Sequence, residues 1–415
     1  MRTQDEQDLP VVVIGAGLAG LAAATTAARA GARVIILESG AVGGRARTQT
    51  QDGFCFNQGP HALFRGGPGR RVLARLGVKT VGHSPPLLGA RALIAGSPHP
   101  FPVTQVGRII ARVAVTRPAA WTGASTAEWI GSTGLRAEVA MLMEAAVRVT
   151  TYASDLGRLP ASLALAQLRS GASGVSYLDG GWEQLTSGLL SRAVTAGAQV
   201  RVHTKVAGIA DGPGAWEVHT DAEVIPAAAV VIAAGRPSSA ERLLPSGQGW
   251  GELGPPVTAA CLDLGLRRPG TRFVLGIDEP LYLSPHAPPG NLAPPGCGLV
   301  HVMRYGATNA ADDREQLWAL AAAAGIRRDD VLAERFLPRM EVVSCLPSAQ
   351  QGLAGRPAVT VPGARGLFLA GDWVGPQGWL SDGSLVSGEQ AGLLAAQAAR
   401  DQPSESGNHQ PVGEP

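Results

Sequence analysis

The chain has 415 residues, of which 45% are hydrophobic and only 5% aromatic, so alanine, valine and leucine must carry most of the packing. This length predicts two domains rather than a single core. The formal net charge is +2 and the basic residues are scattered, so nothing indicates the clustered positive surface of a nucleic-acid-binding protein.

The four cysteines lie far apart and show no metal-ligand spacing, which predicts free thiols and no metal site. The first ten residues are polar and acidic, unlike a secretory signal, and no uncharged apolar run is long enough to span a bilayer. We therefore expect a cytoplasmic protein with at most a peripheral membrane contact.

The first elements form a strand, a helix and a second strand. Residues 11–15 predict a buried parallel strand, residues 18–32 a helix closed by Gly31, and residues 33–38 another buried strand. This order is typical of a nucleotide-binding unit. A Pro-rich stretch at 84–102, with weak strand signals, marks the first crossover to another domain.

Helices dominate the next segment, 103–170, where Ser125 and Glu128 form a predicted capping box. A helix, a strand and a hairpin follow up to a buried strand that ends at Gly235. Residues 236–362 alternate between strand patterns and one helix, and the final segment holds an apolar strand followed by an Ala-rich helix.

The glycine motif GAGLAG at 15–20 lies between the first strand and the first helix. Gly15 allows the tight turn, Gly17 lets the backbone approach a pyrophosphate, and Gly20 lets the helix pack on the strand. The helix N-terminus then faces the phosphates. Glu38, at the tip of the next strand, is expected to accept hydrogen bonds from ribose hydroxyls.

The residues after Glu38 favour FAD over NAD, because a second glycine turn with a cation, at 43–45, suits a dinucleotide that extends past the strand tip. Arg45 would offset pyrophosphate charge. The backbone of residues 59–62 suits the edge of the isoalloxazine ring, and the backbone of Val206 is expected to contact the adenine.

The C-terminal segment supplies the other half of this site. Asp372 ends an apolar strand and would accept a hydrogen bond from a ribityl hydroxyl. The amides of Ser384 and Leu385, at the expected start of the last helix, would face the flavin pyrimidine. A helix N-terminus there favours the reduced, anionic flavin. Both ends of the chain are therefore predicted to hold one FAD.

The chain resembles the flavin-dependent amine oxidase, protoporphyrinogen oxidase and phytoene desaturase superfamily, and is most similar to bacterial phytoene dehydrogenase-related proteins. The likeness covers VIGAGLAG, ESG, GGRART, GFCFNQGPHAL, YLDGGWEQL, VHTKVAGI and LAGDWVG. It implies an α/β fold in which a Rossmann-like FAD-binding domain, built from discontinuous segments, carries an inserted α+β substrate domain. The FAD contacts expected from motif and resemblance are Gly15, Gly17, Leu18, Ala19, Gly20, Glu38, Ser39, Gly44, Arg45, Gly59, Pro60, His61, Ala62, Val206, Gly371, Asp372, Ser384 and Leu385.

The expected domain boundaries follow from the crossovers. Segments 1–83, 175–236 and 362–402 are assigned to the FAD-binding domain, segments 84–174 and 237–361 to the substrate domain, and 403–415 to a disordered tail.

Two positions depart from the superfamily pattern. Asn57 stands where many relatives carry an acid, and the lysine that amine oxidases place near flavin N5 has no counterpart, because the two lysines, Lys79 and Lys205, lie outside the late substrate-domain strands. Amine oxidation is therefore disfavoured.

The expected reaction is dehydrogenation, in which a hydride passes from an apolar, isoprenoid-like or other lipid substrate to flavin N5 across about 3 to 3.5 Å. The electron acceptor (oxygen, quinone or nicotinamide) and the oligomeric state stay open. The alternatives are an amine or protoporphyrinogen-type oxidase, and a non-catalytic prenyl- or lipid-binding protein of the same fold.

The candidate catalytic side chains are His61, His301, Tyr305 and Trp379. Alternation places His301 and Tyr305 on one face of a strand and Arg304 on the other. For His61 the alternative is a structural hydrogen bond near the cofactor, and for Trp379 a place in the core.

One amphipathic helix suggests a route for a lipid substrate. Residues 106–113, VGRIIARV, combine apolar residues at helical spacing with arginines, as in an interfacial helix. The alternative is a helix that only packs on the substrate domain.

Overall fold

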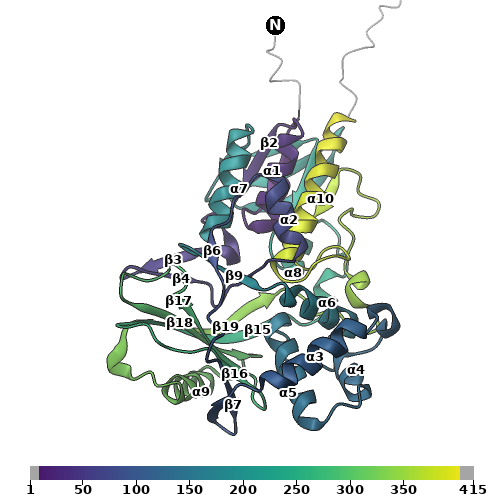
Figure 1. The fold of residues 1–415 in the computed structure, drawn as a ribbon. Coiled ribbons are helices and arrows are strands. Elements are labelled where there is room, and N and C mark those ends of the chain that lie inside the picture. Colours follow the sequence, from purple (N-terminus) through teal and green to yellow (C-terminus); the bar gives the residue numbers. More distant parts are fainter. Residues whose placement is uncertain (1–8, 402–415) are drawn as a thin grey trace, which may run out of the picture.

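The computed structural model describes residues 9–401 as two layered units (Figure 1). The tail expected at 403–415 lies outside the described residues. Among the described residues, no helix is both long enough and apolar enough to cross a membrane.

The first unit is built on a parallel sheet of five strands in the order β10-β2-β1-β14-β20. Four of these strands are fully buried, which fits their continuous Val, Ile and Leu sequences, because a parallel sheet is covered on both faces. The strands are β1 (Val11–Ile14), β2 (Val34–Leu37), β10 (Gln199–Arg201), β14 (Ala229–Ile232) and β20 (Leu367–Leu369).

Three helices lie side by side over this sheet: α7 (Glu183–Thr195), α1 (Leu18–Arg29) and α10 (Ser381–Arg400) (Figure 1). The meander of β11 (Val206–Gly212), β12 (Ala215–Thr220) and β13 (Val224–Ala227) joins the same hydrophobic core. N- and C-terminal segments thus share one core.

The second unit is built on a mixed sheet of seven strands in the order β19-β15-β18-β17-β16-β7-β8. One face is aliphatic and packs on α9 (Ala310–Ala323), and the other face turns toward the helices and toward the first unit. The strands are β7 (Arg91–Ile94), β8 (Ser97–Pro100), β15 (Val257–Leu266), β16 (Val274–Gly276), β17 (Leu281–Ala287), β18 (Gly298–Tyr305) and β19 (Val331–Val343).

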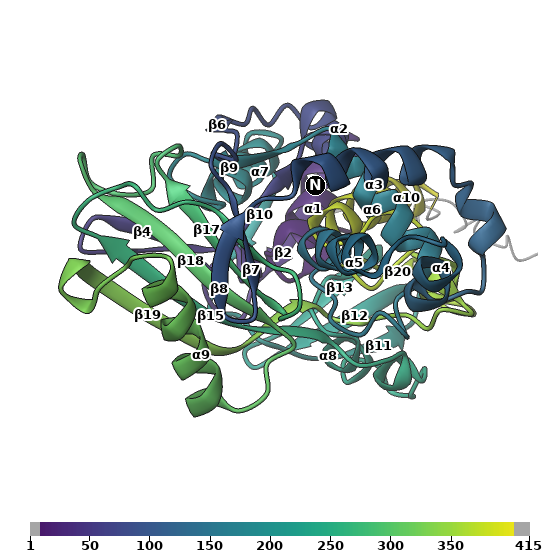
Figure 2. The same cartoon turned by 60° about the horizontal axis from the view of Figure 1, so that its bottom comes forward.

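A group of helices flanks this sheet, as the sequence predicts (Figure 2). The capping box of Ser125 and Glu128 is confirmed, with the Ser125 side chain accepting a hydrogen bond from the Glu128 amide. The helices are α3 (Val103–Val115), α4 (Thr126–Ser132), α5 (Ala137–Thr151) and α6 (Ala161–Ala172).

Short elements join the two units. The remaining strands and α-helices are β3 (Thr48–Gln51), β4 (Phe54–Asn57), β5 (Leu63–Phe64), β6 (Gly82–His83), β9 (Val175–Leu178), α2 (Pro68–Arg75) and α8 (Pro237–Glu241). Strand β9 pairs with both β5 and β6 in a small sheet of its own. The domain boundaries given above stay a prediction.

Candidate functional site

The first glycine turn packs tightly at one residue and stays open at another. A Cβ atom on Gly20 would lie 1.9 Å from the carbonyl oxygen of Gly15, so the helix can approach the strand only through a glycine. A Cβ atom on Gly17, at the start of α1, would meet nothing within 4 Å. The backbone at Gly17 is therefore accessible to a ligand such as a pyrophosphate.

Glu38 fixes this turn from the tip of β2. Its two carboxylate oxygens accept hydrogen bonds from the backbone amides of Ala16 and Gly40, each at 2.8 Å. Its own carbonyl accepts from the amide of Thr204, which brings the segment before Val206 to the same place. Oε1 also accepts a hydrogen bond from the Ser39 hydroxyl at 3.3 Å, whereas Oε2 keeps a second lone pair for a ribose hydroxyl.

The second glycine turn lies directly on the first. A Cβ atom on Gly44 would lie 3.4 Å from the Cα atom of Gly17. The Arg45 guanidinium then reaches Asp372, with Nη2 to Oδ1 at 3.0 Å, and lies 3.9 Å from Glu341. The sequence predicted a phosphate partner for Arg45 and did not predict these two acids. This contact joins the N-terminal turns to the C-terminal segment.

Asp372 is buried and ionised. Its second oxygen accepts a hydrogen bond from the Ser344 amide at 2.9 Å. Burial alone would raise the pKa of Asp372, but Arg45 and the Ser344 hydrogen bond outweigh it and hold the pKa below its ordinary value. The preceding Gly371 exchanges hydrogen bonds with the Ser387 hydroxyl, which ties the end of β20 to α10.

The predicted start of the last helix is wrong by three residues. Helix α10 begins at Ser381, so the amides of Ser384 and Leu385 belong to its internal hydrogen-bond ladder and do not point out of it. The amides without a partner inside the helix are those of its first turn, from Leu380 to Gly383, and of these the Asp382 amide donates to the Trp379 carbonyl at 3.1 Å. The helix N-terminus still lies beside Asp372, because a Cβ atom on Gly383 would touch the Asp372 Cα atom at 3.4 Å.

The segment from Gly59 to His61 lies between the two units. The His61 ring nitrogen Nδ1 is 3.0 Å from the Gly59 carbonyl, and the Tyr152 hydroxyl donates to the Pro60 carbonyl at 3.1 Å. Loss of solvation lowers the pKa of His61 to about 4, so the ring is neutral at pH 7. This geometry supports the structural alternative for His61.

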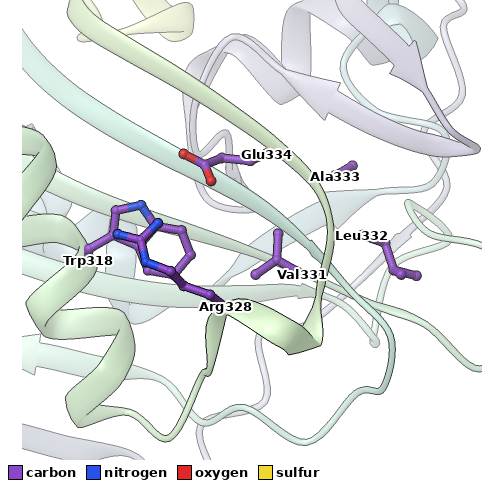
Figure 3. Close-up of a pocket in the computed structure, with 6 residues that line it drawn as sticks. All are labelled: Trp318, Arg328, Val331, Leu332, Ala333 and Glu334. Atoms are coloured by element: carbon purple, nitrogen blue, oxygen red, sulfur yellow. The ribbon is translucent and has the colours of Figure 1, made fainter.

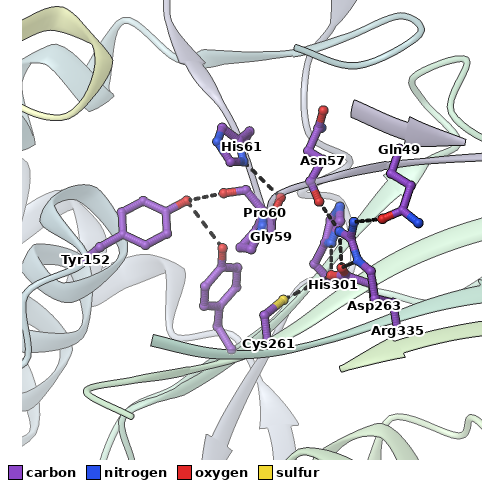
Figure 4. Close-up of polar contacts among 11 residues, drawn as sticks. Gln49, Asn57, Gly59, Pro60, His61, Tyr152, Cys261, Asp263, His301 and Arg335 are labelled. Carbon is purple, nitrogen blue, oxygen red and sulfur yellow. Dashed lines mark hydrogen bonds and ion pairs between the residues drawn. The ribbon is translucent and has the colours of Figure 1, made fainter. Parts of the chain in front are cut away.

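Below this segment the second sheet carries a buried polar cluster (Figure 4). Asp263 Oδ1 accepts hydrogen bonds from His301 Nδ1 at 2.5 Å and from the Cys261 thiol at 3.0 Å. The other oxygen, Oδ2, receives two N–H groups of Arg335, at 2.9 and 2.5 Å. Arg335 also donates to the Asn57 carbonyl and so connects the cluster to the first unit.

The alternation predicted for β18 is confirmed. His301 and Tyr305 are buried on the face toward the first unit, whereas Arg304 turns to the other face and lies 3.4 Å from Asp313 of α9. Tyr305 stacks on Tyr282 and meets Tyr152 edge-on, and its hydroxyl has no hydrogen-bond partner among the described residues.

Trp379 is a core residue. Its indole N–H donates to the Thr151 carbonyl at 2.8 Å, and only 1% of its surface is exposed. The guanidinium of Arg356 lies 5.2 Å from the ring and donates to the Gly378 carbonyl. Both contacts hold the bend before α10.

Sequence reasoning missed Cys261, Asp263, His286 and Arg335. The signal was present in VTAACLDLGL, where two polar residues two apart interrupt an apolar strand and must share a face. A different, shallow pocket lies outside this site (Figure 3). It is lined by Trp318 and Arg328, near α9 on the opposite face of the sheet.

The residues present fit FAD. The open backbone at Gly17, the carboxylate of Glu38 and the buried carboxylate of Asp372 supply a pyrophosphate cradle and two hydroxyl acceptors within one connected group of turns. Such a fold and site define an FAD-dependent oxidoreductase.

Comparison with known proteins gives the family. The chain belongs to the flavin containing amine oxidoreductases, whose family model matches residues 18–265. A stretch of 64 residues is 47% identical to 4,4'-diapolycopene oxygenase from Methylomonas sp, and spans 15% of this chain and 12% of that protein.

Solved structures share the fold over nearly the whole chain. An oxidoreductase from Methanosarcina mazei has a TM-score of 0.74 at 19% identity, with 92% of this chain and 99% of that chain covered. Cyclohexylamine oxidase from Brevibacterium oxydans has a TM-score of 0.70 at 18% identity, covering 95% and 99%. Putrescine oxidase bound to putrescine has a TM-score of 0.70 at 15% identity, covering 93% and 98%.

Proposed function

We propose that this FAD-dependent oxidoreductase dehydrogenates an apolar, isoprenoid-like or other lipid substrate. FAD, when bound, supplies the two-electron oxidant that accepts a hydride. The chain's own residues position the substrate and exclude water.

A cluster of three buried tyrosines in contact with Pro60 is the main observation that supports this proposal. Tyr152, Tyr282 and Tyr305 form a cluster with ring centroids 5.5 to 6.5 Å apart, and the Tyr152 hydroxyl contacts the Pro60 carbonyl. Burial raises the pKa of Tyr152 to about 12 and those of the other two well above their ordinary value. All three rings are therefore uncharged at pH 7 and suit an apolar substrate.

Asp263, a buried acid near this tyrosine cluster, is already neutralised by its neighbours. Asp263 is paired with His301 and Arg335, so it offers no free carboxylate to a cationic amine. Lys79 and Lys205 are both exposed, so neither lies in this buried region. The local similarity to 4,4'-diapolycopene oxygenase supports a polyene as the substrate class.

The proposal is tested by anaerobic bleaching of the bound flavin. Acyclic isoprenoid polyenes and their more saturated precursors, presented in liposomes, are compared with putrescine and with protoporphyrinogen. We expect the visible flavin absorbance to fall only with the isoprenoids. Bleaching by putrescine or protoporphyrinogen alone would replace this function with an oxidase of the corresponding class.

We also propose that α3 contacts an anionic membrane surface, from which such a substrate enters. Contrary to the even spread of charge expected above, residues 53–127 contain nine Arg or Lys and no Asp or Glu. Among the described residues, seven of the twelve exposed large aliphatic side chains lie between 81 and 115. On α3, Val103 and Ile110 are 73% and 58% exposed, although Ile109 and Val113 are buried. Apolar side chains flanked by cations suit an anionic bilayer.

Vesicle flotation tests this contact. The protein should float with vesicles that contain phosphatidylserine and remain at the bottom with phosphatidylcholine alone. The double substitution Val103→Asp and Ile110→Asp should abolish flotation, whereas Val224→Asp, at a position on β13 that is 49% exposed, should not. Equal flotation of the double variant would remove the membrane contact from the account.

A further inference from the structure

His301 is held in one orientation by a buried carboxylate. His301 and Asp263 are both 0% exposed, and Nδ1 lies 2.5 Å from Asp263 Oδ1. Two N–H groups of Arg335 fix the other oxygen. Because an ionised carboxylate only accepts hydrogen bonds, Nδ1 must carry the proton in this pair.

The opposite ring nitrogen of His301 has no partner. Nε2 is buried and makes no hydrogen bond with any described residue. Two other imidazoles lie near the His301 ring: His286 on β17, edge-on with centroids 4.4 Å apart, and His61, which interacts with it electrostatically. Buried polar atoms are nearly always paired, so an unpaired one calls for a ligand or a proton.

His286 is not a charged proton donor for that nitrogen. Its ring stacks on Tyr177 at 3.7 Å, and its Nδ1 is also buried without a partner. Burial holds the pKa of His286 well below its ordinary value, so the ring is neutral at pH 7.

The cluster is a poor metal site despite its composition. Cys261, Asp263 and His301 offer ligand atoms within 4.8 Å of one another. Arg335 already occupies Asp263 Oδ2 with a positive charge, so a second cation would be repelled. The arrangement instead matches a carboxylate that orients an imidazole for proton transfer.

We propose that His301 is the catalytic base of the oxidation, with Asp263 and Arg335 as positioning residues. Bound FAD would accept the hydride that one substrate carbon releases when its C–H bond breaks. A second bond to hydrogen breaks, its proton passes to His301 Nε2, and its electron pair forms the new double bond. The inference rests on the proposed dehydrogenation, but not on the lipid nature of the substrate.

Proton NMR of the FAD-bound enzyme labelled with ¹⁵N-histidine tests the assignment without any substrate. We expect one histidine, identified by its absence in His301→Gln, to be protonated at Nδ1 and unprotonated at Nε2 at neutral pH. In Asp263→Asn the amide donates to Nδ1, so the proton should move to Nε2. This inversion also identifies the resonance if His301→Gln does not fold. Protonation of Nε2 in the unaltered enzyme would overturn the proposal, since that nitrogen would have no lone pair to accept a proton.

A kinetic measurement complements this spectrum. With any compound that bleaches the flavin, His301→Gln and Asp263→Asn should slow flavin reduction by about 100-fold or more, with FAD content unchanged. His219 on β12, whose side chain is 40% exposed, provides a matched control, and the flavin of His219→Gln should be reduced at the original rate. An unaltered rate in His301→Gln would also overturn the assignment. Failure of isoprenoids alone to bleach the flavin would instead count against the proposed substrate.

Discussion

Two glycines three residues apart in the first turn have different physical roles. Gly20 is required by packing, because its Cβ would lie 1.9 Å from the Gly15 oxygen, whereas Gly17 has open space around it. Gly20→Ala should therefore destabilise the fold by about 3 kcal/mol or more. Gly17→Ala should cost about 1 kcal/mol or less yet release FAD, because its methyl group would point toward the pyrophosphate. Thermal unfolding and the flavin absorbance per protein separate the two effects. Full FAD content in Gly17→Ala would contradict this assignment.

Glu38 stabilises the first glycine turn and is also expected to bind the cofactor. Because its oxygens hold two backbone amides at 2.8 Å, Glu38→Ala should cost about 1 to 3 kcal/mol as well as cofactor affinity. Glu38→Gln is the matched variant, since it keeps one acceptor oxygen and loses the charge. We expect lower FAD occupancy in both variants, measured after gel filtration. Unchanged occupancy in Glu38→Ala would show that this carboxylate does not hold the ribose.

Contacts of single residues show which parts of the site the sequence could predict and which it could not. The places of the glycines and acids of the candidate FAD site were predictable, because local turns and strand ends fix them. The pairing of Arg335 with Asp263 and with the Asn57 carbonyl was not, since these contacts join residues 72 and 278 positions apart. No local periodicity encodes which distant side chain neutralises a buried acid.

Helix α10 depends on two glycines where it crosses α1. Cβ atoms on Gly388 and Gly392 would each lie 2.3 Å from a carbonyl oxygen of α1. Gly388→Ala or Gly392→Ala should separate the helices and lower stability by about 1 to 3 kcal/mol. Gly107→Ala is a matched control at an exposed position of helix α3, where nothing lies within 4 Å of the added Cβ atom, and should raise stability by up to about 1 kcal/mol. Urea unfolding measures all three, and equal stability of the α10 variants would refute the close contact.

The first turn of α10 also predicts a pH dependence. Burial raises the pKa of Asp382 to about 6, although this carboxylate accepts a hydrogen bond from the Gly69 amide of α2. The folded protein thus binds this proton more tightly than the unfolded chain, so stability is lost as pH rises through about 6. Between pH 5 and 7.5 the loss should be roughly 1.4 kcal/mol. It should vanish in Asp382→Asn, measured by urea unfolding at both values. An unaltered pH dependence in that variant would assign the effect to another group.

The start of α10 was mispredicted for a physical reason. The residue before it, Leu380, has a φ of 55° and no side-chain cap, so the sequence lacks the polar N-cap that normally marks a helix start. Gly383, in the first turn, also made the start of the helix harder to predict, because glycine is a poor helix former. By contrast, the long apolar strands and the capping box of α4 follow local rules and were predicted correctly.

At the scale of the whole molecule, the sheet order explains how both chain ends reach the candidate FAD site. Strand β14 lies between β1 and β20, so the N-terminal and C-terminal segments are bound into one sheet. The glycine turns after β1 and β2 and the acid after β20 then emerge at the same edge, since the carboxyl ends of parallel strands share it. The contact between Arg45 and Asp372 at 3.0 Å shows the two ends in direct contact.

The most direct measurement is an experimental structure of the protein with FAD bound. We predict a single FAD whose pyrophosphate contacts the backbone at Gly17 and whose ribityl chain contacts Asp372. A cofactor that touches only one of these two residues would contradict the central claim that both ends of the chain hold the same flavin.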